Sequence, residues 1–219
     1  MAKRPARRHT RKQPGKSVRK ASRKSKISGK KRAAATKSKS RAGGGKGGVG
    51  GGGKGSPVSN QARAVTMLTL AHEMLQPLIA DFPADRATFQ TAPTDNHLLW
   101  TMGHLCTAYS WFASEIDGKA ADMPENYNGL FGYGSKPVPD AGVYPPMSEI
   151  MQVCKRAYQR VMDAITGLSE ADFDKPPVSG ASGFAKTKMD VVSRLAWHEG
   201  WHQGQLSTLR RALGLKNTF

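Results

Sequence analysis

The chain has 219 residues, with 34 Lys and Arg against 16 Asp and Glu, which gives a formal net charge of +18 at pH 7. Residues 1–56 hold 20 of the basic residues and none of the acidic ones, so residues 57–219 carry 14 basic and 16 acidic residues, a net charge of −2. This distribution excludes a basic globular domain, because the whole excess of positive charge belongs to the first 56 residues.

Residues 1–56 form a Lys/Arg-rich stretch, residues 1–41, followed by a Gly-rich tract. With so few apolar side chains the segment cannot offset the entropy of an ordered chain, so we expect a disordered tail and a flexible linker. It has no apolar run typical of a secretory signal. Contacts with nucleic acid phosphates are one hypothesis for residues 1–41, with salt-sensitive binding and a nucleoid-associated location. The alternatives are a tail without a partner and a translation start closer to Ser56.

Residues 57–219 show helical spacing of apolar residues and few strand signals. The first expected helix spaces Val65, Leu68, Leu75 and Ile79 along one face. Thr187 and Asp190 could form a capping box at the start of the fourth, and the segment Thr94-Asp95-Asn96 could cap the second. The predicted helices are 61–80, 97–116, 148–166 and 188–213. We therefore expect an all-α fold: an antiparallel four-helix bundle with a long connection between helices 2 and 3.

The longest stretch without a charged residue, Asn96–Ser114, is 19 residues long, which is enough to raise the question of a membrane span. It contains two histidines and several hydroxyl and amide side chains, so we expect a buried bundle helix instead, with no membrane partner. Cys106 and Cys154 are distant in sequence and form no C-x-x-C pair. They favour a reducing, cytoplasmic location with both thiols in the core. The connection over residues 123–146 is rich in Pro, Gly and aromatic residues, and we expect it to cross the end of the bundle, with Tyr127, Phe131 and Tyr133 as a plug or a lid.

The fourth helix contains the segment HEGWHQGQL, residues 198–206, which fits the H-E-x-x-H pattern of zinc peptidases. His198 and His202 continue the apolar stripe of this helix, one turn apart, so they point into the bundle and could hold one ion. The peptidase hypothesis makes Glu199 the general base and needs a third ligand downstream. None of the 17 residues after His202 is Asp, Glu, His or Cys, so a third ligand has to come from upstream. Two core histidines without a metal are the structural alternative.

The upstream candidates in the predicted helices are His72, His97 and His104. His97 and His104 are seven residues apart, about 10 Å along a helix, so they cannot bind the same ion. His104 has the deeper position and follows Gly103, which would permit a close approach of another segment. Residue spacing alone leaves these candidates open.

The segments NHLLWTMGHL in the second helix and HEGWHQGQLSTLRRALG in the fourth resemble those of the DinB/YfiT-like family of metal-binding four-helix bundles. The resemblance covers about Gln61–Leu215 and leaves out the basic tail. In that family, the histidine of G-H-L and the two of H-x-x-x-H-x-G-Q bind a divalent metal. The resemblance therefore implies the ligands His104, His198 and His202.

Three neutral imidazoles leave a coordination position open, as in catalytic sites. Family members with an assigned role are mostly transferases of low-molecular-weight thiols. The resemblance thus implies a metal-dependent enzyme with a small-molecule substrate and a thiol cosubstrate. Its reaction would be thiol transfer by a metal-activated thiolate, or hydrolysis by metal-bound hydroxide. Zinc is the expected metal, with nickel, iron and manganese as alternatives, and a homodimer is one expected assembly.

Three further residues, Trp100, Trp201 and Gln205, are candidates for the pocket or for contacts with the metal ligands. Gln205 shares a face with both histidines of the fourth helix and could hydrogen-bond one of them. Glu199 keeps a catalytic role only as a general base. Besides the enzyme and the peptidase, a third function class remains: a non-catalytic metal- or ligand-binding module tethered to nucleic acid by the tail.

Overall fold

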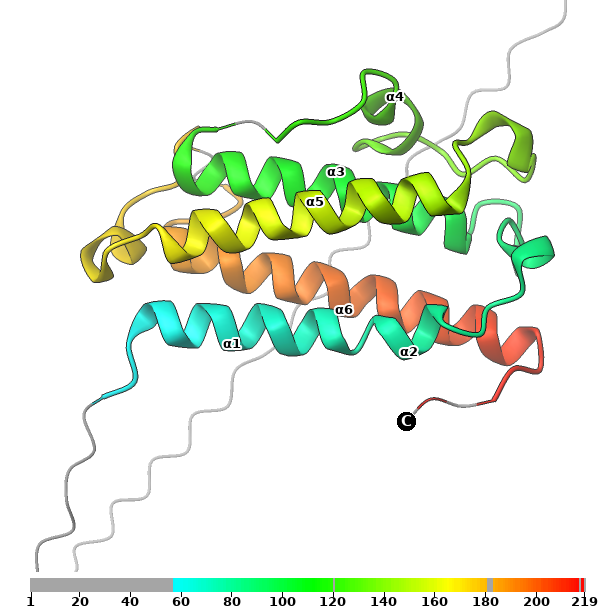
Figure 1. The fold of residues 1–219 in the computed structure, drawn as a ribbon, viewed down its shortest axis with the longest axis horizontal. Helices are drawn as coiled ribbons and strands as arrows, with labels where there is room; N and C mark the ends of the chain where they lie inside the picture. The colour runs from blue at the N-terminus through cyan, green and yellow to red at the C-terminus, as the bar shows by residue number, and fades with distance from the viewer. Residues whose placement is uncertain (1–56, 120, 181–182, 217, 219) are drawn as a thin grey trace, which may run out of the picture. The chain divides into compact units, whose positions relative to one another are not determined.

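The computed structural model describes residues 57–119, 121–180, 183–216 and 218; the predicted basic tail and linker, residues 1–56, lie outside these residues. The described part of the chain is helical and contains no strand. Its α-helices are α1 Asn60–Glu73, α2 Gln76–Ile79, α3 Leu98–Asp117, α4 Tyr127–Phe131, α5 Met147–Thr166 and α6 Lys188–Ala212 (Figure 1). Three short 3-10 helices lie between them: η1 Ala84–Arg86, η2 Ala141–Val143 and η3 Glu170–Asp174. The all-α fold class is thus confirmed for these residues.

The first predicted helix, 61–80, is two helices, since α1 ends at Glu73 and α2 begins at Gln76. Pro77 explains the break: it has no backbone N–H to donate, and its ring would collide with the carbonyl of Glu73 one turn earlier. The prediction of one continuous helix was wrong at this point. Both helices contact α6, and Figure 1 shows them following each other along it.

The expectation of antiparallel neighbours needs a correction, because α3 and α5 run in the same direction (Figure 1). In the first half of both helices, the Cys106 thiol lies 3.5 Å from the Ile150 carbonyl oxygen. Near their ends, Asp117 Oδ1 accepts a hydrogen bond of 2.5 Å from Arg160 Nη2. The cause is the long connection: a 20-residue helix is about 30 Å long, and residues 118–146 suffice to return along it.

We expected the connection to cross the end of the bundle. Instead, its helix α4 packs against α3. Tyr127 and Phe131 of α4 are buried, whereas Tyr133 is exposed. The contact depends on Gly103, because a Cβ atom there would lie 2.3 Å from the Phe131 ring. A residue without a side chain therefore lets α4 approach the first half of α3.

Helix α3 is buried on most of its surface, which agrees with its lack of charged residues over Asn96–Ser114. Its N-cap is His97, whose Nδ1 accepts a hydrogen bond of 3.1 Å from the Trp100 N–H. The predicted cap segment Thr94-Asp95-Asn96 was one residue too early. The other His97 nitrogen donates to the Val138 carbonyl at 2.9 Å, so this histidine is structural.

The end of α6 is fixed by Arg210, which is 3% exposed. Its guanidinium pairs with Asp81 and donates to the carbonyl groups of Leu78 and Lys216. Its burial is not evident from the sequence, since the arginine lies in a basic pair at a helix end. Cys106 and Cys154 are free thiols in the core. Among the described helices, none has the length and hydropathy to cross a membrane.

Candidate metal centre

His104 enters the site from α3 with its ring fixed by the neighbouring α4 segment. Its Nδ1–H donates a hydrogen bond of 2.7 Å to the Phe131 carbonyl, because a carbonyl oxygen can only accept. The proton is therefore on Nδ1, and the lone pair of Nε2 is available. Since Gly103 permits the approach of Phe131, the glycine before the histidine contributes to fixing its tautomer.

His202 is fixed from the same helix, α6, by Gln205. Gln205 Oε1 accepts a hydrogen bond of 2.8 Å from His202 Nδ1, which again leaves Nε2 available. The same Oε1 accepts a hydrogen bond of 3.2 Å from Asn96 Nδ2 just before α3. Gln205 thus connects His202 to Asn96. Such hydrogen bonds behind a ligand are typical of metal-binding histidines.

The three Nε2 atoms converge. His198 Nε2 lies 3.2 Å from the Nε2 atoms of both His104 and His202. One ligand atom from each of the three residues lies within 4.8 Å of the others. Nitrogens about 2.0–2.1 Å from one zinc ion at roughly tetrahedral angles are about 3.2–3.4 Å apart, so these separations fit a shared ion.

Burial keeps the three rings neutral. It lowers the pKa of His104, with the hydrogen bond to Phe131 acting in the opposite direction. Burial, with a smaller effect from the charge of His104, lowers the pKa of His198 to about 4. For His202, burial and then the other two histidines lower the pKa to about 3. At neutral pH all three can therefore offer a lone pair to a cation.

A cavity of about 630 Å³ borders the histidines, within the usual range for small-molecule sites. His104 and His198 line it, whereas His202 is buried and is not among the lining residues. The side of the cluster that faces the cavity is the place where a further ligand could reach an ion. Apart from the two histidines, the wall is mainly apolar and aromatic: Ala108, Trp111, Phe112, Tyr133, Phe184 and Trp197.

The two tryptophans proposed for the pocket lie in different places. Trp100 is buried and stacks on the His104 ring, with centroids 4.6 Å apart, and its Nε1–H donates to Ser135 Oγ. Trp201 is 54% exposed and contacts Trp197 edge to face. The expected pocket position of Trp201 is corrected, because it lies on an uncovered face of α6 and does not line the cavity.

Glu199 is fully buried between the helices, away from the cavity wall. Its Oε1 accepts a hydrogen bond from the Tyr109 hydroxyl and lies 3.3 Å from His72 Nδ1. Burial raises the pKa of this carboxyl, opposed by the hydrogen bond and charge of His72. His72, one of the candidate ligands, thus contacts Glu199 and stacks on Tyr158 instead of joining the other three histidines.

Sequence reasoning missed two contributors to the site. The Phe131 carbonyl cannot be anticipated from side-chain identity, because it depends on how the connection folds. Arg194 could have been found, since it lies one turn before His198 and therefore on the same face of α6. It lines the cavity together with the two histidines.

Comparison with known proteins agrees with this geometry. The family model described as the DinB superfamily matches residues 67–206, which include His104, His198 and His202. No curated protein matches the chain. Because the matched segment covers 140 of the 219 residues, the chain belongs to the DinB superfamily.

Proposed function

We propose that the protein is a divalent-metal-dependent enzyme that transfers a low-molecular-weight thiol to a small electrophilic molecule. The observation that carries the proposal is the convergence of the His104, His198 and His202 Nε2 atoms at the edge of a cavity. Zinc is the expected metal, with nickel, iron and manganese as alternatives; imidazole nitrogens suit the first three, whereas manganese more often binds oxygen ligands. A divalent ion bound there would supply a Lewis acid that lowers the pKa of a thiol.

The protein's own residues supply orientation and shelter. The hydrogen bonds from His104 to Phe131 and from His202 to Gln205 hold two imidazoles with Nε2 towards the cluster. The aromatic wall of the cavity can exclude water from a bound thiolate and its partner, which strengthens electrostatic interactions. In the reaction, a C–S bond forms, the bond to the leaving group breaks, and the thiol proton passes to solvent.

The cavity favours thiol transfer over hydrolysis. Among the described residues that line it there is no carboxylate, so no Asp or Glu is placed to take a proton from water. A thiol, with an ordinary pKa of about 8.5, depends less on such a base. The same observation speaks against the peptidase alternative, because the Glu199 carboxylate bonds to Tyr109.

The test is metal analysis of the purified full-length chain followed by conjugation of cysteine or glutathione to monochlorobimane, which releases chloride. We expect a chelator to abolish enzymatic conjugation and zinc to restore it. Alanine at any of the three histidines should remove both metal and activity. His97→Ala should retain the metal, because the His97 ring hydrogen-bonds to Val138 and Trp100 and is not part of the three-histidine cluster. Conjugation that is insensitive to the chelator would refute the proposal; a metal-loaded protein inactive with every thiol would favour the non-catalytic binding module.

We further propose that α1–α2, α3, α5 and α6 form one four-helix bundle, which the single core cluster of buried residues supports. Nucleic acid contact through residues 1–41 remains a proposal supported by the charge of +20 on residues 1–56. It predicts weak duplex DNA binding by the full-length chain that collapses as salt rises. Binding that is insensitive to salt would rule it out. The cytoplasmic location and the homodimer likewise remain proposals.

A further inference from the structure

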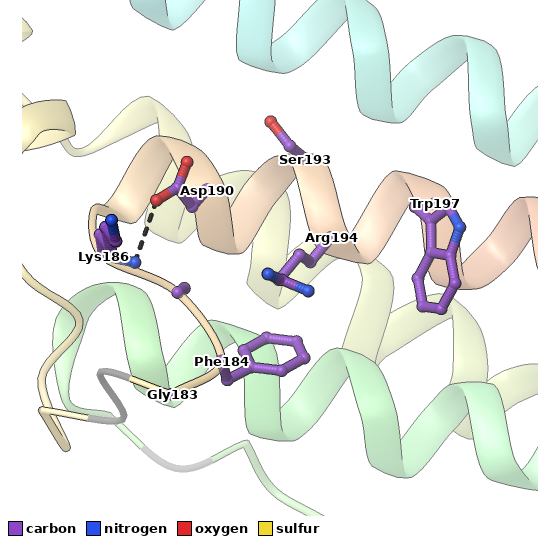
Figure 2. A pocket seen from close by; sticks show the side chains of 8 residues that line it. Gly183, Phe184, Lys186, Asp190, Ser193, Arg194 and Trp197 are labelled. Atoms are coloured by element: carbon purple, nitrogen blue, oxygen red, sulfur yellow. Dashed lines mark hydrogen bonds between the residues drawn. The ribbon is translucent and has the colours of Figure 1, made fainter. Parts of the chain in front are cut away.

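Arg194 lies at the junction of the cavity and a second hollow. It is on α6, one turn before His198, or about 6 Å along the helix. Arg194, Phe184 and Trp197 line both the cavity beside the histidines and a groove along residues 183–197. Figure 2 shows the Arg194 side chain extending towards the Phe184 ring, with Trp197 on the same helix. A molecule in the cavity can therefore reach this guanidinium.

No described residue forms a hydrogen bond or an ion pair with the guanidinium. Its contact is with the Phe184 ring, whose centroid lies 4.8 Å from Arg194 Cζ. The nearby carboxylate on the same helix, Asp190, instead accepts a hydrogen bond of 3.0 Å from the backbone N–H of Lys186 (Figure 2). It accepts a second one, of 3.1 Å, from the backbone N–H of Thr187. Asp190 acts on the guanidinium only at longer range: the pKa of that carboxyl is lowered mainly by backbone hydrogen bonds, with the charge of Arg194 as the smallest cause. The N–H donors of Arg194 thus remain available to a ligand.

The remaining cavity wall indicates what the rest of that ligand is like. Arg194 is the one Lys, Arg, Asp or Glu among the described residues of the wall. Aromatic side chains, including Trp111, Phe112 and Trp197, make up much of the rest. Away from the histidines, such a wall fits an apolar or aromatic body with one negative charge, because a second charge there would lie against apolar side chains without a partner.

We propose that Arg194 determines substrate specificity by binding the carboxylate of a small organic acid whose apolar or aromatic body fills the cavity. The planar guanidinium fits a carboxylate through two parallel hydrogen bonds, and a monoanion balances its single charge. The inference deepens the proposed function, since it rests on this cavity being the substrate site. It does not depend on which bond is made or broken at the histidines.

The test compares binding of 2-naphthylacetate and its uncharged analogue 2-naphthylacetamide to the full-length, zinc-loaded protein by calorimetry at physiological ionic strength. We expect the acid to bind about tenfold more tightly than the amide. Arg194→Gln should remove this preference and leave the affinity for the amide unchanged. The matched control is Arg211→Gln, which removes the same charge from α6 where the guanidinium bonds to Ser207 and Thr208. The control should keep the preference.

Equal binding of acid and amide to the wild-type protein, or a preference that survives Arg194→Gln, would overturn the inference. Repeating the titrations after chelation separates this inference from the proposed function. A preference that depends on Arg194 in the metal-free protein supports the carboxylate site even if the enzyme activity fails. A preference that disappears on chelation but not in Arg194→Gln means that the acid binds at the histidines, and the inference is wrong.

Discussion

Gly103→Ala is the most direct perturbation of the site that leaves every metal ligand in place. The new Cβ would lie 2.3–2.5 Å from three atoms of the Phe131 ring, including Cγ at its base. Ordinary carbon contacts are about 3.5–4.0 Å, so the ring has to retreat by more than about 1 Å. It cannot do so easily, because it is fully buried and stacks on Tyr144 with centroids 5.5 Å apart.

The expected magnitude has two parts. Overpacking of this kind costs about 1–3 kcal/mol, whereas alanine in place of glycine inside a helix gains about 0.5–1 kcal/mol, so we expect a net loss of up to about 2.5 kcal/mol. Displacement of Phe131 also moves its carbonyl, which holds His104 Nδ1 at 2.7 Å. Loss of such a contact behind a metal ligand typically lowers metal affinity about 10- to 100-fold.

Urea unfolding of the metal-free protein measures the first effect, and competition with a zinc chelator dye measures the second. Gly204→Ala is the matched control: it lies in α6 between His202 and Gln205, and a Cβ there meets nothing within 4 Å. We expect that control to gain about 0.5–1 kcal/mol and to keep its zinc affinity. If Gly103→Ala has wild-type stability and zinc affinity, the argument that Gly103 positions His104 through Phe131 is wrong.

Further changes test other parts of the structure. His97→Ala removes the N-cap of α3 and should cost about 1 kcal/mol by urea unfolding while dye competition shows zinc retained; loss of zinc would contradict the structural role of this histidine. Arg210→Ala should cost about 2 kcal/mol or more by thermal unfolding, because the carbonyl groups of Leu78 and Lys216 lose the hydrogen bonds of a buried guanidinium, while Asp81 is 58% exposed and can be hydrated; an unchanged melting temperature would contradict this. Burial lowers the pKa of His198 to about 4 and of His202 to about 3 from 6.5. As the pH falls, the unfolded chain therefore takes up protons at these histidines before the folded chain does. The free energy of unfolding of the metal-free protein should therefore fall from about pH 6.5 towards pH 4; a flat profile by urea unfolding would contradict this.

Local sequence signals predicted the helical segments well, because the information lies within each segment. The lack of charge over Asn96–Ser114 indicated a helix buried on most sides, and α3 is such a helix. Thr187 and Asp190 form the predicted capping box at the start of α6. Where the prediction of α1 failed, the signal was also local: Pro77 breaks the helix, and apolar spacing alone does not register it.

Relations between segments were harder to predict. The apolar pattern of a helix is the same whether its neighbour runs parallel or antiparallel to it, so the common direction of α3 and α5 is not encoded in either segment. The position of α4 depends on the fit of Phe131 against Gly103. The one-turn spacing of His198 and His202 predicted an ion site on α6. The choice of His104 as the third ligand depended on the family resemblance.

The stripe of α6 shows why the spacing was informative. In a bundle, the positions of Glu199 and His202 would ordinarily hold leucine, since burying polar groups costs free energy unless they are paired. Glu199 accepts a hydrogen bond from Tyr109, and His202 donates one to Gln205. Beside the site, however, two buried atoms of the described chain, His198 Nδ1 and Glu199 Oε2, have no hydrogen-bond partner; Arg210 Nε, near the end of the same helix, is a third. Apolar residues would cost less here, so these side chains point to function. A cation bound by the three Nε2 atoms would offset the cost in the native state alone, because the unfolded chain does not bring His104 to the other two.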